Sequence, residues 1–166
     1  MRIKIWQIAG FVYIALLGVF LHFLYKLSGE NHFAGYFSAV NESVWEHLKL
    51  IYWPALTFSI IEYFAYGKHS ADFFAVKMCG IVVAMTFIVT FFYTYSGILG
   101  FSLAAVDIAS FFIGAFFCQF VSYRLSMGNS TNEKADGFRG LVTLILIGVC
   151  FIIWTYNPPY LGIFWG

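Results

Sequence analysis

Charged side chains are scarce in this chain. Nine residues are lysine or arginine and eight are aspartate or glutamate, so only 10% of the 166 residues are charged, against about 25% in soluble domains. Hydrophobic residues make up 61% and aromatic residues 22%, and the mean hydropathy is +0.83. This composition excludes an ordinary soluble domain and indicates an integral membrane protein.

Several patterns that mark common functions are also missing. The net charge is +1 and there is no basic cluster, so a nucleic-acid partner is not expected. No GxSxG, phosphate loop or dinucleotide fingerprint is present. The three cysteines, Cys79, Cys118 and Cys150, lie in apolar runs without CxxC or Cys/His spacing, so we interpret them as small core residues.

Five apolar stretches follow one another along the chain, separated by glycine, charged or asparagine-rich breaks. A membrane-spanning helix needs about 20 apolar residues. The sequence therefore predicts an all-α fold, a single domain over residues 1–166 built as a bundle of about five transmembrane helices. The expected spans are Ile5–Tyr25, Trp45–Tyr66, Phe74–Tyr95, Ile98–Tyr123 and Leu141–Tyr156.

The positive charges predict how the chain is oriented. Cytoplasmic segments of membrane proteins carry an excess of lysine and arginine. With the N-terminus inside, the cytoplasmic side holds seven of the nine basic residues: Arg2, Lys4, Lys68, Lys77, Arg124, Lys134 and Arg139. We therefore expect a cell-membrane protein with a cytoplasmic N-terminus and an extracytoplasmic C-terminus, surrounded by membrane lipids and open to homo-oligomer formation.

The longest outer connection, Lys26–Asn41, is only weakly polar. Such a segment lies in the membrane interface or turns back into the bundle as a re-entrant segment. It leads directly into the second span. Asn41 or Ser38 suits the N-cap of that helix, and Ser43 followed by Glu46 matches a capping box.

The run NESVWEH, residues 41–47, places ionisable groups where they are costly and usually functional. Helical spacing predicts Glu42, Glu46 and Lys49 on one stripe, with Ser43 and His47 on the adjoining face. Acids at a helix N-terminus also satisfy free amides, which is the plain structural interpretation. Capping alone does not require Glu42, His47 and Lys49, so this run is the candidate site.

Other ionisable residues share its predicted depth. Asp107 lies on a stripe with Ser110, Gly114 and Cys118, whose small side chains allow close helix contact. We expect five residues to converge in the outer third of the membrane: His22, Glu42, Glu46, His47 and Asp107. Glu62 lies about 24 Å further along its helix and is expected either to pair with Lys68, Lys77 or Arg124 or to end a polar path.

Two imidazoles and carboxylates suit zinc or another divalent metal with an open position for water. The predicted metal ligands are His22, His47 and Glu46. No HExxH spacing is present, so hydrogen-bonded histidines without metal are the alternative. In that case Glu42 and Glu46 share a proton and act as acid and base.

The motif Asn41-Glu42-Ser43-x-Trp45-Glu46-His47 and the closing run Tyr156-Asn157-Pro158-Pro159 carry a resemblance. The chain resembles a family of functionally uncharacterised small bacterial membrane proteins over nearly its whole length. This implies a polytopic fold in a bacterial membrane and brings no activity. Membrane-embedded ceramidase-like hydrolases also set serine, histidine and acidic residues near one face, but their seven spans and paired histidines make the comparison an analogy.

Three functions fit these residues. In a hydrolase or transferase acting on a lipid or other amphiphile, Glu46 is the general base and Asp107 orients the ligands or proton carriers His47 and His22. In a small oligomeric transporter of ions, protons or small molecules, Glu42, Glu46 and Asp107 bind the cargo. In a non-catalytic accessory protein, the polar cluster only holds the bundle together.

Overall fold

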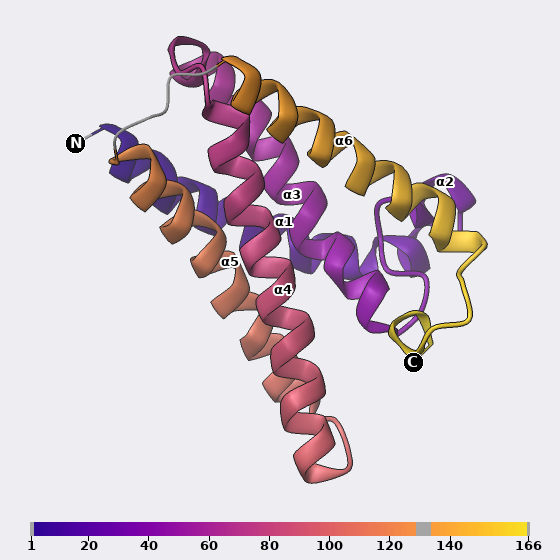
Figure 1. Ribbon diagram of the computed structural model, residues 1–166. Helices are drawn as coiled ribbons and strands as arrows, with labels where there is room; N and C mark the ends of the chain where they lie inside the picture. The colour runs from indigo at the N-terminus through magenta and orange to yellow at the C-terminus, as the bar shows by residue number, and fades with distance from the viewer. Residues whose placement is uncertain (1, 129–133, 166) are drawn as a thin grey trace.

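The chain forms a bundle of helices (Figure 1). The structure, a computed structural model, describes residues 2–128 and 134–165. All regular elements in these residues are helical, which confirms the predicted all-α class. They are α1 (Arg2–Leu27), α2 (His32–Gly35), α3 (Val44–Ala65), the 3-10 turn η1 (Gly67–His69), α4 (Phe73–Leu99), α5 (Ala104–Ser126), α6 (Lys134–Tyr156) and the 3-10 turn η2 (Gly162–Phe164).

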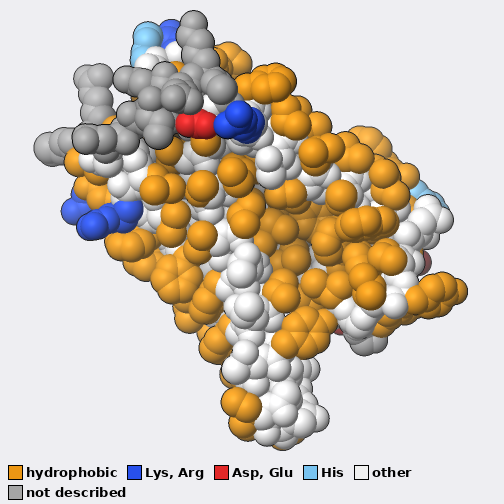
Figure 2. All heavy atoms as spheres, in the orientation of Figure 1, with side chains coloured by type: hydrophobic (Ala, Val, Ile, Leu, Met, Phe, Trp, Pro, Cys, Tyr) orange, Lys and Arg blue, Asp and Glu red, His pale blue; other side chains and the backbone are white. Residues whose placement is uncertain are grey.

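Four helices are long and apolar enough to cross a membrane. They are α1 from Ile3 to Leu27, α4, α5, and α6 from Asp136 to Tyr156. At 1.5 Å per residue each reaches the roughly 30 Å of a hydrocarbon core. Figure 2 shows a face that is mostly hydrophobic, with lysine, arginine and acidic side chains gathered near the end that holds the N-terminus. These features indicate a multi-pass membrane protein.

Helix α3 is the enclosed helix of the bundle. It packs against α1, α4, α5 and α6, and its buried residues include the ionisable Glu46, Lys49 and Glu62. Contact with other helices rather than lipid makes these charges tolerable, because they find protein partners. Four of the five expected spans thus have the length and composition of a membrane span. The fifth, α3, carries buried charges and lies at the centre of the bundle.

Helix α1 approaches α3 closely at a proline. Pro54 has no N–H to donate to the carbonyl of Leu50 one turn earlier. Gly18 of α1 lies against this carbonyl, since a Cβ atom at position 18 would stand 2.6 Å from the Leu50 oxygen. Any larger residue at position 18 would push the two helices apart.

The two helices that flank the turn at Gly100 have later bounds than the sequence predicts. Helix α4 continues to Leu99 and α5 begins only at Ala104, whereas the expected spans end at Tyr95 and begin at Ile98. Gly100 ends α4 with a left-handed φ of 79°, which glycine adopts without strain. The sequence also predicts a tight turn around Gly97 and Gly100, and this turn is confirmed at Gly100. The expected start of the next span at Ile98 was too early, because residues 98–103 belong to the end of α4 and to the turn. The resulting hairpin extends beyond the other helices (Figure 1).

A buried ion pair joins α3 to α4 at the end of α3 that leads into η1. Glu62 is fully buried, and its Oε2 pairs with Nζ of Lys77. Its Oε1 accepts hydrogen bonds from Nε2 of Gln7 at 3.1 Å and from the Tyr66 hydroxyl at 2.7 Å. The expected pairing of Glu62 with a lysine is confirmed, and the partner is Lys77. The interaction connects α1, α3 and α4.

Replacing Lys77 by methionine should test this ion pair. Lys77→Met keeps the length of the side chain but leaves the buried Glu62 carboxylate without its cation, which should reduce the free energy of unfolding by about 3–5 kcal/mol. Denaturant unfolding in detergent micelles would measure the loss. Lys68→Met, at an exposed lysine of η1, is the control and should change little. Equal stabilities of the two variants would contradict the structural role of the pair.

Candidate functional site

The segment between α1 and α3, residues 28–43, folds back along α3. Nε1 of Trp53 donates a hydrogen bond to the Tyr36 carbonyl at 3.1 Å, and Nζ of Lys49 donates to the Gly35 carbonyl at 2.7 Å. Lys49 and Trp53 lie about 8 and 14 Å further along the helix than Val44. Residues 35 and 36 are therefore seated beside the body of α3 and not beyond its first turn.

Glu46 and Lys49 form a second buried ion pair, which holds this segment in place. Oε2 of Glu46 lies 2.6 Å from Nζ of Lys49 and accepts a hydrogen bond from the Val40 N–H at 2.9 Å. The Lys49 ammonium also donates to the Gly35 carbonyl and to Oγ1 of Thr155 in α6 at 3.0 Å. These three contacts match the three donors of an ammonium group. The pair joins α3, the 28–43 segment and α6.

The N-cap of α3 is Ser43. Its Oγ accepts a hydrogen bond from the Glu46 N–H at 3.3 Å, as half of the predicted capping box requires. The other half is replaced, because the Glu46 carboxylate accepts from Val40 while Oδ1 of Asn41 accepts from the Ser43 N–H at 2.9 Å. The alternative N-caps, Asn41 and Ser38, were therefore wrong.

Three potential metal ligands meet beside this cap. One donor atom each from His22, Glu42 and His47 lies within 4.8 Å of the other two. His22 comes from the end of α1, Glu42 from the turn before α3, and His47 from the start of α3. The histidine ring centroids are 5.3 Å apart, and Nε2 of His47 lies 3.5 Å from Oε2 of Glu42. The structure thus brings together three of the five residues expected to converge.

The proton on His47 can be assigned from its neighbours. Nδ1 lies 2.8 Å from the carbonyl oxygen of Ser43, which can only accept, so Nδ1 carries the hydrogen. In the neutral ring Nε2 is then an acceptor, and it faces a carboxylate of Glu42 that also only accepts. A proton on Nε2 or a metal cation between the two atoms would make this contact favourable. A ring nitrogen held by a backbone carbonyl is also the usual arrangement in metal-bound histidines.

His22 has unused hydrogen-bonding capacity. Its Nδ1 is buried and has no hydrogen-bond partner among the residues that the structure describes. The ring packs edge-on against Phe23 with centroids 5.0 Å apart. Buried polar atoms in proteins nearly always have a partner. An ion or a water molecule in this cluster would therefore complete an arrangement that the side chains leave open.

Two of the expected site residues face elsewhere. The carboxylate of Glu46 is 2% exposed and engaged by Lys49. Glu42 precedes the first helical residue, Val44, so the expected stripe of Glu42 with Glu46 does not form and Glu42 turns to His47. Asp107 lies in the first turn of α5 and accepts a hydrogen bond from the Tyr95 hydroxyl in the α4–α5 hairpin.

Comparison with protein families gives a match over the whole chain, from residue 1 to residue 166. The chain belongs to DUF6512, a family of unknown function. The full-length match agrees with the extent of the resemblance seen in the sequence. Comparisons with curated proteins and with solved structures give no match. Any function must therefore be argued from the geometry of the site.

Substitution by glutamine should destabilise the protein strongly at one glutamate of the motif and hardly at the other. Glu46→Gln leaves the buried Lys49 ammonium without its carboxylate, so we expect a loss of about 3–5 kcal/mol in the free energy of unfolding. Glu42→Gln makes the identical chemical change on a side chain that is 68% exposed, and in metal-free protein it should stay within about 0.5 kcal/mol of the parent. Denaturant unfolding followed by tryptophan fluorescence compares them. Similar losses in both variants would show that this division of roles is wrong.

Proposed function

We propose that the protein is a membrane-embedded, metal-dependent hydrolase or transferase. In this proposal His22, Glu42 and His47 hold a divalent metal, with zinc the best match to two imidazoles and one carboxylate. The supporting observation is that donor atoms from three separate segments lie within 4.8 Å of one another. The contact of His47 Nε2 with the Glu42 carboxylate at 3.5 Å adds to this support, because both atoms can bind the same metal cation.

The spacing suits closure around a metal ion. Ligand bonds of about 2.0–2.2 Å in a tetrahedral site place neighbouring donor atoms about 3.4 Å apart. Nε2 of His47 and Oε2 of Glu42 are 3.5 Å apart. The other donor atoms lie within 4.8 Å of one another, and the exposed Glu42 side chain can rotate to bring its carboxylate closer to the histidines. His22, Glu42 and His47 would hold the metal, and a divalent metal with three protein ligands would supply a water activated as a nucleophile near neutral pH.

The surroundings of the cluster favour a substrate at the membrane boundary. His22 and His47 lie at the end of α1 and the beginning of α3, and Glu42 is exposed. An amphiphile can reach such a cluster from the membrane with its polar group at the metal. Glu46 acts in this proposal as a positioning residue, since its buried pair with Lys49 fixes the turn of α3 that carries His47. Asp107 belongs to the hairpin and not to the cluster.

A transporter is less well supported. Ion passage requires polar groups that continue from the cluster to the opposite end of the bundle. On α3 the next carboxylate is Glu62, which is fully buried and paired with Lys77. That carboxylate is already neutralised by protein. This arrangement favours a site that opens at one end only.

We also propose that α3 crosses the membrane with the four apolar helices, which gives five spans and puts the chain ends on opposite sides. The exposed Lys4 and Lys68 lie toward the end of the bundle opposite the cluster. Lysines favour the cytoplasmic side. The N-terminus would then be cytoplasmic, and the cluster of His22, Glu42 and His47 extracytoplasmic.

Metal binding tests the functional proposal directly. The purified protein should bind about one zinc ion per chain in competition with a chromophoric chelator. His47→Ala should weaken binding by more than about 100-fold, because loss of a ligand exceeds the 10- to 100-fold effect of losing a supporting contact. His69→Ala, at an exposed histidine of η1, is the matched control. Wild-type zinc affinity in His47→Ala, or no zinc binding by the parent, would overturn the proposal.

Thiol labelling tests the orientation. In a background with Cys79, Cys118 and Cys150 replaced by alanine, Ser28→Cys should react with an impermeant maleimide in intact cells, because Ser28 is exposed at the cluster end. Lys68→Cys should react only after the membrane is permeabilised. The reverse pattern would place the cluster in the cytoplasm.

A further inference from the structure

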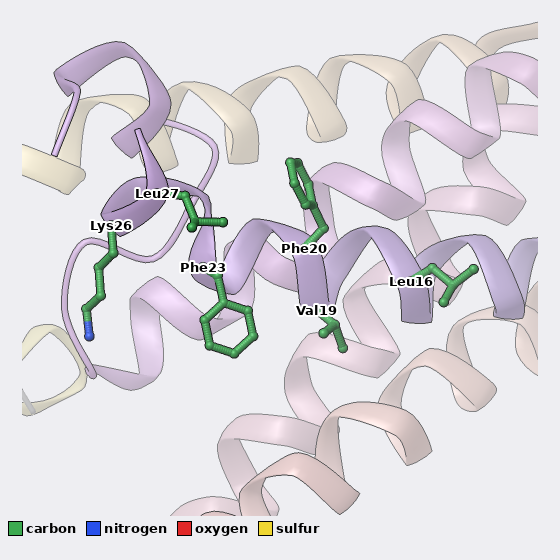
Figure 3. Close-up of a pocket in the computed structure, with 6 residues that line it drawn as sticks. All are labelled: Leu16, Val19, Phe20, Phe23, Lys26 and Leu27. Carbon is green, nitrogen blue, oxygen red and sulfur yellow. The ribbon is translucent and has the colours of Figure 1, made fainter. Parts of the chain in front are cut away.

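A shallow, open groove of about 470 Å³ lies between side chains on the outward face of α1 (Figure 3). Five apolar side chains and one lysine line it, all of them from α1: Leu16, Val19, Phe20, Phe23, Lys26 and Leu27. Leu16 is 69% exposed and Phe23 52% exposed, so the groove faces the surroundings of the bundle.

The charged end of this groove adjoins the metal-ligand cluster. Lys26 lies one helical turn beyond His22 on α1, so the two side chains share one side of the helix. The Phe23 ring, which lines the groove, packs against the His22 ring with centroids 5.0 Å apart. A molecule that fills the groove and reaches Lys26 therefore ends beside His22, Glu42 and His47.

We propose that an anionic glycerophospholipid occupies this groove, with an acyl chain along Leu16 and Phe20, its phosphate at Lys26, and its headgroup at the cluster. This inference rests on the proposed function and names its substrate class. Charge complementarity selects this occupant, because a lysine at the membrane boundary attracts anionic phosphate groups. The apolar helix of a second protein copy would bring no anion to Lys26 and would remove its charge from water.

Lipid selectivity in bilayers tests the headgroup contact. Full-length protein is placed in phosphatidylcholine nanodiscs with a trace of spin-labelled phosphatidylglycerol or spin-labelled phosphatidylcholine, with a chelator present, and the immobilised fraction of each lipid is measured. The parent should prefer phosphatidylglycerol. Lys26→Gln should weaken this preference severalfold, because it removes the cation that faces the lipid phosphate. Lys68→Gln, the control at the other end of the bundle, should keep it.

A second pair of variants tests the groove itself. Leu16→Trp fills the groove and should lower immobilisation of phosphatidylglycerol, whereas Ile145→Trp on the lipid-facing side of α6, 55% exposed, should not. Wild-type preference in Lys26→Gln would overturn the inference. So would full displacement of the lipid by soluble glycerol phosphate, which would show an anion site without an acyl chain. A dimer that Leu16→Trp disrupts without changing lipid immobilisation would show that a second copy is the occupant.

The chelator separates this inference from the proposed function. Because no metal is needed for the lipid to bind, a protein that binds no zinc should still select phosphatidylglycerol if the groove is a lipid site. Loss of lipid selectivity in a protein with intact zinc binding would overturn the lipid site alone.

Discussion

The ion pair between Glu46 and Lys49 is the interaction on which the cluster end of the molecule depends. Removing two charges from water is expensive, and their mutual attraction offsets the cost only when the remaining donors and acceptors are satisfied. Here the Val40 N–H, the Gly35 carbonyl and Thr155 satisfy them. The pair therefore requires the 28–43 segment and α6 to be in place, and in turn holds both against α3.

Helical geometry connects this pair to the candidate site. Adjacent residues on a helix point about 100° apart, so a Glu46 side chain fixed in the interior sends His47 to the neighbouring face, where it meets His22 of α1. At the other end of α3, Glu62 and Lys77 form the second buried pair. Between the pairs lies an apolar core that includes Ile51. Lipid provides little hydrophobic force between helices, so these polar contacts specify how the helices assemble.

The sequence was sufficient for the helical class and for much of the site. Long apolar runs separated by short breaks predict membrane helices because lipid leaves the backbone few other choices. The meeting of His22 with His47 followed from their similar depths on two helices. The choice between Glu42 and Glu46 could not be predicted in this way, because it depends on helix α3 beginning at Val44. The capping box of Ser43 and Glu46 already favours this boundary, but Asn41 and Ser38 were N-cap alternatives. The contacts of the 28–43 segment that exclude them are long-range and leave no periodic pattern in the sequence. Asp107 was misplaced for a related reason. The turn at Gly100 could be predicted, but not that α5 begins only at Ala104 and that the α4–α5 hairpin extends beyond the other helices.

Exposure separates the two acidic residues of the motif into different roles. Glu46 is 2% exposed and already neutralised by Lys49, so it contributes to stability and holds His47 in position. Glu42 is 68% exposed and its carboxylate lies 3.5 Å from Nε2 of His47, so its second oxygen remains open to a ligand from solvent. Its partners in the cluster belong to α1 and α3. A metal bound there would cross-link two helices and the turn between them, and the free energy of metal binding would add to the stability of the fold. The same ion that provides the proposed chemistry would then also stabilise the contact of α1 with α3 that forms its site.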